Sequence, residues 1–65
     1  MLITVRHLEL AKAQGHPMCV RGLRAWFERH GLSFQDFVRN GLPIERVEAT
    51  DELGRMIARI AREED

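Results

Sequence analysis

Residues 19–33 read Cys19-Val20-Arg21-Gly22-Leu23-Arg24-Ala25-Trp26-Phe27-Glu28-Arg29-His30-Gly31-Leu32-Ser33. The apolar side chains recur at the spacing of an amphipathic helix. On a helical wheel, one side holds Cys19, Val20, Leu23, Trp26, Phe27 and His30. Gly31 then tolerates the left-handed backbone that ends many helices, and Ser33 can cap the helix that follows. The segment therefore predicts a core-facing helix, a tight turn and the start of a second helix.

Similar capping and turn residues divide the rest of the chain into short helices. Thr4 can cap a first helix that stops at Gly15, and Pro43 can open a short fourth one. The last helix starts from a cap at Thr50 or Asp51 and repeats apolar residues at i, i+3, i+4, i+7 and i+8. The predicted helices cover residues 5–14, 19–30, 34–39, 44–47 and from the last cap to about 62. The β-branched residues around Thr4 leave open an extended start over residues 3–5.

We therefore predict a single all-α domain over residues 1–65, a compact bundle of four to five short helices. The expected core comprises Leu8, Ala11, Val20, Leu23, Phe27, Phe34, Phe37, Val47, Leu53, Met56, Ile57 and Ile60. Cys19 is expected to be buried on the same apolar stripe. A chain this short buries only about 60% of its unfolded surface, and its single cysteine forms no intrachain disulfide. Association with another chain or with copies of itself is therefore expected.

The charge of the chain is balanced overall and divided along its length. Ten basic and ten acidic residues cancel, so no long-range field attracts the chain to nucleic acid or to a membrane. Residues 1–42 hold six Lys/Arg and three Asp/Glu, a net of +3, whereas residues 43–65 hold four and seven, a net of −3. No segment has the roughly 20 apolar residues of a membrane span, and the early charge at Arg6 argues against a signal peptide. A reducing cytoplasm suits the lone thiol.

The residue types that carry catalysis or metal binding are few and scattered. His7, His16, His30 and Cys19 share no ligand spacing, and no glycine-rich phosphate loop or nucleophile elbow is present. We therefore expect no catalytic residue, no metal and no cofactor, and we interpret the chain as a protein that is not an enzyme.

Two features are candidates for contact with a partner. Trp26 lies at the edge of the apolar stripe, where an exposed indole could anchor a partner and a buried one would belong to the core. Arg55, Arg59 and Arg62 line the outer face of the last helix, where they could grip an acidic partner or simply be solvated.

A helix-turn-helix is the alternative to a protein-binding module. In one arrangement the turn lies near Gly15 and the next helix reads DNA with Arg21 and Arg24. In the other arrangement the turn lies at residues 30–33 and the reading helix offers Gln35 and Arg39. The zero net charge counts against DNA, because several phosphate contacts require surplus basic charge.

The pattern of residues 19–34, 37–43, Glu45 and 49–51 resembles small proteins encoded by tailed bacteriophages and prophages. The resemblance implies a phage origin and synthesis in the bacterial host cytoplasm. It also connects the chain with virion morphogenesis. We therefore expect a module that binds another phage or host protein, or copies of itself, in the assembly or structure of a virion head or tail. The alternative is a small excisionase-like or repressor-like DNA-binding regulator.

Overall fold

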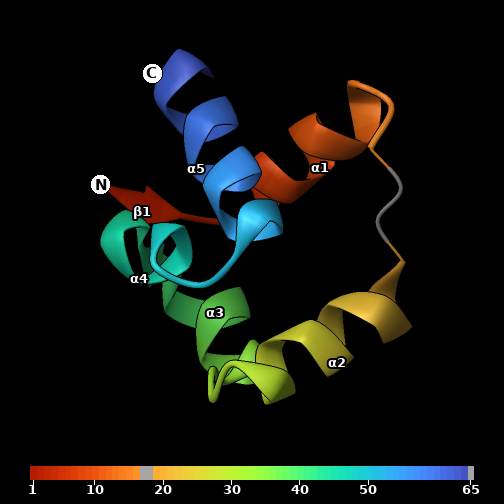
Figure 1. Ribbon diagram of the computed structural model, residues 1–65, viewed down its shortest axis with the longest axis vertical. Coiled ribbons are helices and arrows are strands. Elements are labelled where there is room, and N and C mark those ends of the chain that lie inside the picture. The colour runs from red at the N-terminus through yellow and green to blue at the C-terminus, as the bar shows by residue number, and fades with distance from the viewer. Residues whose placement is uncertain (17–18, 65) are drawn as a thin grey trace.

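Five helices and one two-stranded sheet make up residues 1–16 and 19–64, the part of the chain that the computed structural model describes (Figure 1). The elements are β1 (Leu2–Ile3), α1 (Val5–Ala13), α2 (Val20–Arg29), α3 (Phe34–Asn40), β2 (Leu42–Pro43), α4 (Ile44–Glu48) and α5 (Glu52–Glu64). With 71% of the described residues in helices, the structure has the predicted all-α class. None of these helices is long and apolar enough to cross a bilayer.

The helix starts follow the capping residues that the sequence indicates. The Ser33 hydroxyl accepts a hydrogen bond from a backbone N–H in the first turn of α3. At the start of α5 the cap is Asp51, whose Oδ1 accepts from the Gly54 N–H at 3.1 Å. Thr50, the other candidate, instead donates its hydroxyl to the Val47 carbonyl at 2.6 Å. Local capping chemistry therefore sets these boundaries.

The chain begins extended, as the alternative for residues 3–5 anticipated in part. Leu2 and Ile3 form β1 and pair antiparallel with Pro43 and Leu42 of β2, and the first helix begins only at Val5. The strands meet next to the residue that ends α3. This residue, Gly41, has φ +77°, and a Cβ atom added to it would lie 2.9 Å from the Ile3 carbonyl oxygen. Glycine is therefore required at this crossing, which brings the N-terminus to the middle of the chain.

Helix α5 is the element around which the others are arranged. Helices α1 and α4 both pack on it, β1 and β2 lie against α4, and α2 lies against α3 at one end of the molecule (Figure 1). Of the two helix-turn-helix pairings considered, the structure therefore brings together α2 and α3. Helix α1 does not pack closely on α2, because it packs on α5 instead. Its buried residues are His7, Leu8 and Ala11.

The core agrees with most of the expected residues. Those found buried are Leu8, Ala11, Phe27, Phe37, Val47, Ile57 and Ile60, and those half-buried against the core are Leu23, Phe34, Leu53 and Met56. Further buried residues are Ile3, Trp26, Leu32, Leu42, Ile44, Ala58 and Ala61. The expectation is wrong for Val20, which is 61% exposed, and for Cys19, which is also exposed. Helix α2 is buried only in its second half, so its first turn extends beyond the core.

Candidate functional site

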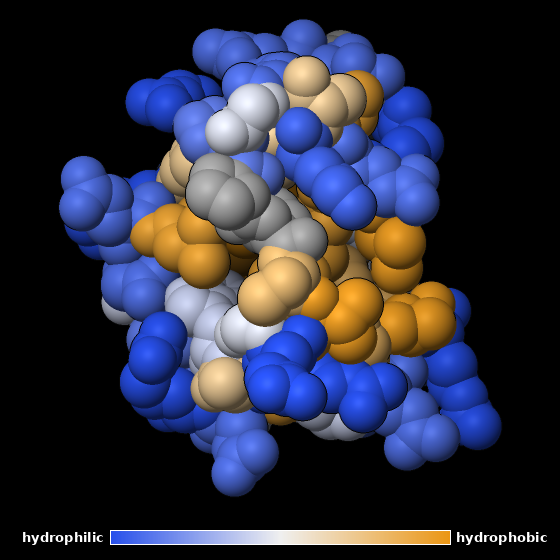
Figure 2. Space-filling view, turned by 90° about the vertical axis from the view of Figure 1, so that its right-hand side faces the viewer, coloured by the Kyte–Doolittle hydropathy of each residue, from blue (hydrophilic) through white to orange (hydrophobic). Residues whose placement is uncertain are grey.

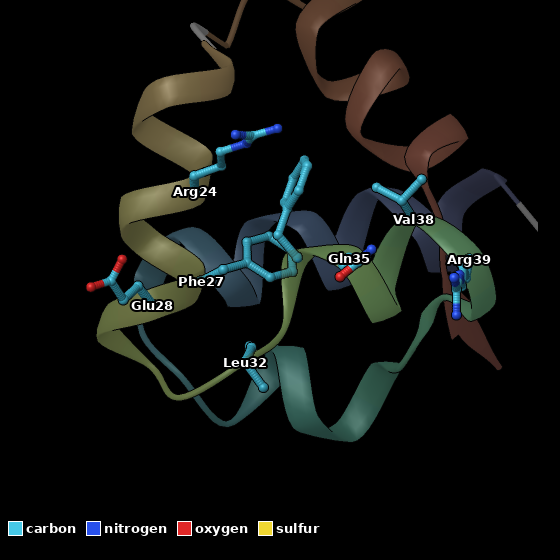
Figure 3. A pocket seen from close by; sticks show the side chains of 8 residues that line it. Arg24, Phe27, Glu28, Leu32, Gln35, Val38 and Arg39 are labelled. Carbon is cyan, nitrogen blue, oxygen red and sulfur yellow. The ribbon is translucent and has the colours of Figure 1, made fainter.

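A hollow of about 720 Å³ lies between α2 and α3 (Figure 3). Its apolar lining comes from Phe27, Leu32, Phe34 and Val38, and its polar rim from Arg24, Glu28, Gln35 and Arg39. Arg24 extends from α2 over the hollow, whereas the Glu28 carboxylate points away from it (Figure 3). The site is therefore an apolar groove whose rim carries two arginines, one glutamate and one glutamine. We call it the α2–α3 groove.

Aromatic packing joins the two helices beneath the α2–α3 groove. The Phe27 ring lies between the helices, with its centroid 5.2 Å from that of Phe34 and 5.0 Å from that of Phe37. The Phe27 and Phe37 side chains are buried, whereas Phe34 is half-buried. Since these rings fix the separation of α2 and α3, the groove belongs to the folded framework and is formed before any partner arrives.

Apolar surface at the groove is open to solvent. Val38 on α3 is 54% exposed and lines the groove beside the half-buried Phe34. Figure 2 shows one face of the molecule, on which hydrophobic residues gather at mid-height between hydrophilic residues above and below. A chain of 65 residues has few large apolar side chains to leave uncovered, so an open apolar groove marks a candidate binding surface.

The two helices of the groove carry a surplus of positive charge. Together α2 and α3 hold four arginines (Arg21, Arg24, Arg29 and Arg39) and two acidic residues (Glu28 and Asp36), which gives a net charge of +2. No ion pair within residues 1–16 and 19–64 involves any of these arginines. The Arg24 guanidinium lies over the Phe34 ring, 5.4 Å from its centroid. The rim therefore offers cations whose charges no acid of the described chain neutralises.

The structure brings together three of the four residues considered for DNA contact. Arg24, Gln35 and Arg39 all line the α2–α3 groove. Arg21 is exposed on the same helix as Arg24 but does not line the groove. These residues came from two different helix-turn-helix arrangements, and they meet because α2 and α3 pack as a pair.

Trp26 is buried, so of the two alternatives for this residue the structure supports a place in the core and not an exposed anchor. The side chain is 3% exposed, and its indole N–H donates to both carboxylate oxygens of Asp51 at 3.2 and 3.1 Å. The His30 Nε2 lies 3.2 Å from the same carboxylate. The segment that enters α5 thus covers the edge of the α2 stripe, where a helical wheel alone leaves the indole open to solvent.

The Asp51 carboxylate joins α2 to α5. Burial raises its pKa, but the hydrogen bonds from the Gly54 N–H, Trp26 and His30 outweigh burial and hold the pKa of Asp51 below its ordinary value. A His–Asp pair can act in acid–base chemistry when the carboxylate orients the imidazole. Here the same carboxylate also caps α5 by accepting the Gly54 N–H, and it accepts the indole N–H of Trp26. Its arrangement is therefore that of a structural junction.

The predicted arginine stripe of α5 divides into two parts. Arg62 forms a two-bond pair with Glu48, one bond measuring 2.9 Å, and this pair lowers the pKa of the Glu48 carboxyl. Arg55 and Arg59 are exposed and have no ion-pair partner among the described residues. They line a second hollow of about 690 Å³, together with Glu52, Leu53 and Met56. Arg62 thus ties α5 to α4, and the other two remain available to a partner.

His7 is a buried residue whose structural position the sequence did not indicate. It is 3% exposed, and its Nδ1 accepts a hydrogen bond from the Thr4 backbone N–H at 3.0 Å. Its Nε2 is buried without a hydrogen-bond partner among the described residues. The ring therefore acts as the returning cap of α1, with Nδ1 as the acceptor of the Thr4 N–H.

No group of three or more His, Cys, Asp and Glu side chains in residues 1–16 and 19–64 is arranged to hold a metal ion. Comparison of the chain with protein-family models, curated proteins and solved structures finds no match. The α2–α3 groove is therefore interpreted from its own geometry.

Proposed function

We propose that this chain is a non-enzymatic protein–protein interaction module of a bacteriophage or prophage. It would be made in the bacterial host cytoplasm and act in the assembly or structure of the virion head or tail. The observation that carries the binding role is the open apolar groove between α2 and α3, in which Val38 is 54% exposed. The phage context rests on the resemblance of residues 19–34, 37–43, Glu45 and 49–51 to small phage proteins.

The lining of the groove favours a protein over other ligands. The exposed Val38 and the half-buried Phe34 offer apolar surface, which is what the centre of a protein interface buries. The polar residues on the rim are two arginines, a glutamine and a glutamate, which is not a set with a nucleophile and a base to activate it. These properties support binding without catalysis.

DNA binding is the second candidate, and one observation favours it. Arg24, Gln35 and Arg39 converge on one groove, and long polar side chains of these types read base edges. A mobility-shift assay with a random duplex at low salt separates the two functions. A shift that weakens steeply with salt, and that is lost on joint Arg21→Ala and Arg24→Ala substitution, would replace the protein-binding proposal.

The proposal is tested with a matched pair of valine variants in a phage that encodes the chain. Val38→Asp places a charge in the groove, whereas Val20→Asp places the same charge on an equally open valine, 61% exposed, outside it. Mass spectrometry should find the wild type and Val20→Asp in purified particles or in a sedimenting assembly complex, and Val38→Asp in neither. A wild type that stays monomeric, is absent from particles and co-purifies with no assembly protein would refute the proposal.

A further inference from the structure

The geometry points to an acidic amphipathic helix of another protein as the occupant of the α2–α3 groove. This inference rests on the proposed function and adds the chemistry of the partner. It is carried by three features of the described residues: the shape and apolar lining of the groove, the unpaired arginines on its rim, and the absence of a suitable occupant elsewhere in the chain.

The apolar lining fits side chains that project from one face of a helix. The groove has a volume of about 720 Å³, enough for a few large side chains, and it runs between two helices. Helical partners dock in such grooves through apolar anchors spaced i, i+3, i+4 and i+7. Leu32 and Phe27 are buried and close the floor, so the apolar surface that a partner would cover is that of the exposed Val38 and the half-buried Phe34.

The rim selects acidic residues beside those anchors. Arg24 and Arg39 stand on opposite helices of the groove, and no acid of the described chain pairs with either. Because the Arg24 guanidinium already lies over the Phe34 ring, a partner carboxylate could pair with it without displacing it from the ring. Glu28 points away from the groove and would not repel that carboxylate (Figure 3). Acidic residues that flank apolar anchors therefore complement both edges.

A second copy of this chain offers no such helix among its described residues. The acidic turn of α5 holds Glu63 and Glu64, but the apolar side chains before it, Ile57 and Ile60, are buried in their own core. Glu64 is also paired with Arg6 at 3.0 Å. The acidic end of α5 therefore has no apolar face to place in a neighbouring groove, which favours a different protein as the occupant.

Designed peptides test the chemistry directly by isothermal titration against the full chain. The probe is an acetylated, amidated peptide of roughly 16 residues, long enough to form a helix, with leucines at i, i+3, i+4 and i+7 and glutamates flanking them. Its matched control carries lysines in place of the glutamates. The acidic peptide should bind, and the basic peptide should bind at least about tenfold more weakly, because two attractive charge pairs become repulsive.

Charge reversal on the protein completes the experiment. The joint Arg24→Glu and Arg39→Glu variant should prefer the basic peptide, whereas the joint Arg55→Glu and Arg59→Glu variant, with the same charge change on α5, should keep the wild-type preference. Equal binding of both peptides, no binding of either, or the same loss in both double variants would overturn the inference. If the peptides fail while particle incorporation still depends on Val38, the groove binds a protein of other chemistry and only this inference is lost. A random duplex that competes with the acidic peptide for the groove would assign the arginines to nucleic acid and also overturn it.

Discussion

Replacing Asp51 by alanine is expected to remove about 2–3 kcal/mol from the free energy of unfolding. The substitution removes the N-cap of α5, which is worth about 1 kcal/mol. It also leaves the indole N–H of Trp26, which is 3% exposed, without its acceptor, at a cost of about 1–3 kcal/mol. The Asp51 side chain is 39% exposed, so water can partly replace the carboxylate and the sum falls in the lower half of the range. For a small domain this is a large share of the total stability.

Urea unfolding monitored by circular dichroism and by the fluorescence of the single tryptophan measures this loss. Trp26 is itself part of the junction, so its emission should shift to longer wavelength in the variant. The matched control is Asp36→Ala, which removes an aspartate from the first turn of α3 whose backbone N–H, and not its carboxylate, makes the cap with Ser33. The control should cost less than about 0.5 kcal/mol. An Asp51→Ala variant as stable as this control would show that the junction between α2 and α5 does not stabilise the fold.

Three further outcomes follow from the same structure. Because the pKa of Asp51 is lowered in the folded state, its charge stabilises the fold above the unfolded pKa of about 3.9, and this contribution is lost as pH falls through the lower folded pKa. The urea midpoint of the wild type should therefore fall more between about pH 6 and pH 3 than that of Asp51→Asn, and equal slopes would contradict this. A Cβ at Gly54 would overlap the Val47 carbonyl, so Gly54→Ala should cost about 2 kcal/mol or more in thermal or urea unfolding. Gly22→Ala, where the Cβ would meet only the Cys19 sulfur at 3.0 Å, should stay within about 1 kcal/mol of wild type. Val20→Ala should change the free energy of unfolding by less than about 0.5 kcal/mol, whereas Val47→Ala should lower it by about 2 kcal/mol. Equal losses in the two variants would show that Val20 is buried like Val47.

Local chemistry explains which parts of the fold were predictable. Ser33 and Asp51 bond to backbone N–H groups three residues ahead, so a short window of sequence is enough to place the starts of α3 and α5. The repeat of apolar residues in α5 likewise predicts its buried face, which includes Ile57 and Ile60.

Errors arose where burial depends on distant segments. The helical wheel treats α2 as covered along its whole length, but only its second half meets the core, so Val20 is exposed. The choice between the two alternatives for Trp26 likewise needed a distant segment, because its indole N–H bonds to Asp51, which lies 25 residues further along the chain. Sequence spacing contains no information about that contact, because it is created by the placement of α2 beside the start of α5.

The candidate site was predictable in its residues but not in its shape. Arg24, Gln35 and Arg39 were singled out as long polar side chains near helix starts or turns, and all three line the α2–α3 groove. The apolar floor beneath them follows from the rings of Phe27 and Phe34, which the sequence indicates only as core. A groove needs the distance between two helices, and that distance is a property of the packed structure.

Chemical-shift mapping of the full chain with the acidic helical peptide tests the central claim most directly. If the α2–α3 groove is the binding surface, backbone amide shifts should change along residues 24–39 and remain unchanged at Arg55 and Arg59 on α5. Changes centred on α5, or none at peptide concentrations that saturate comparable helix-binding grooves, would contradict the account.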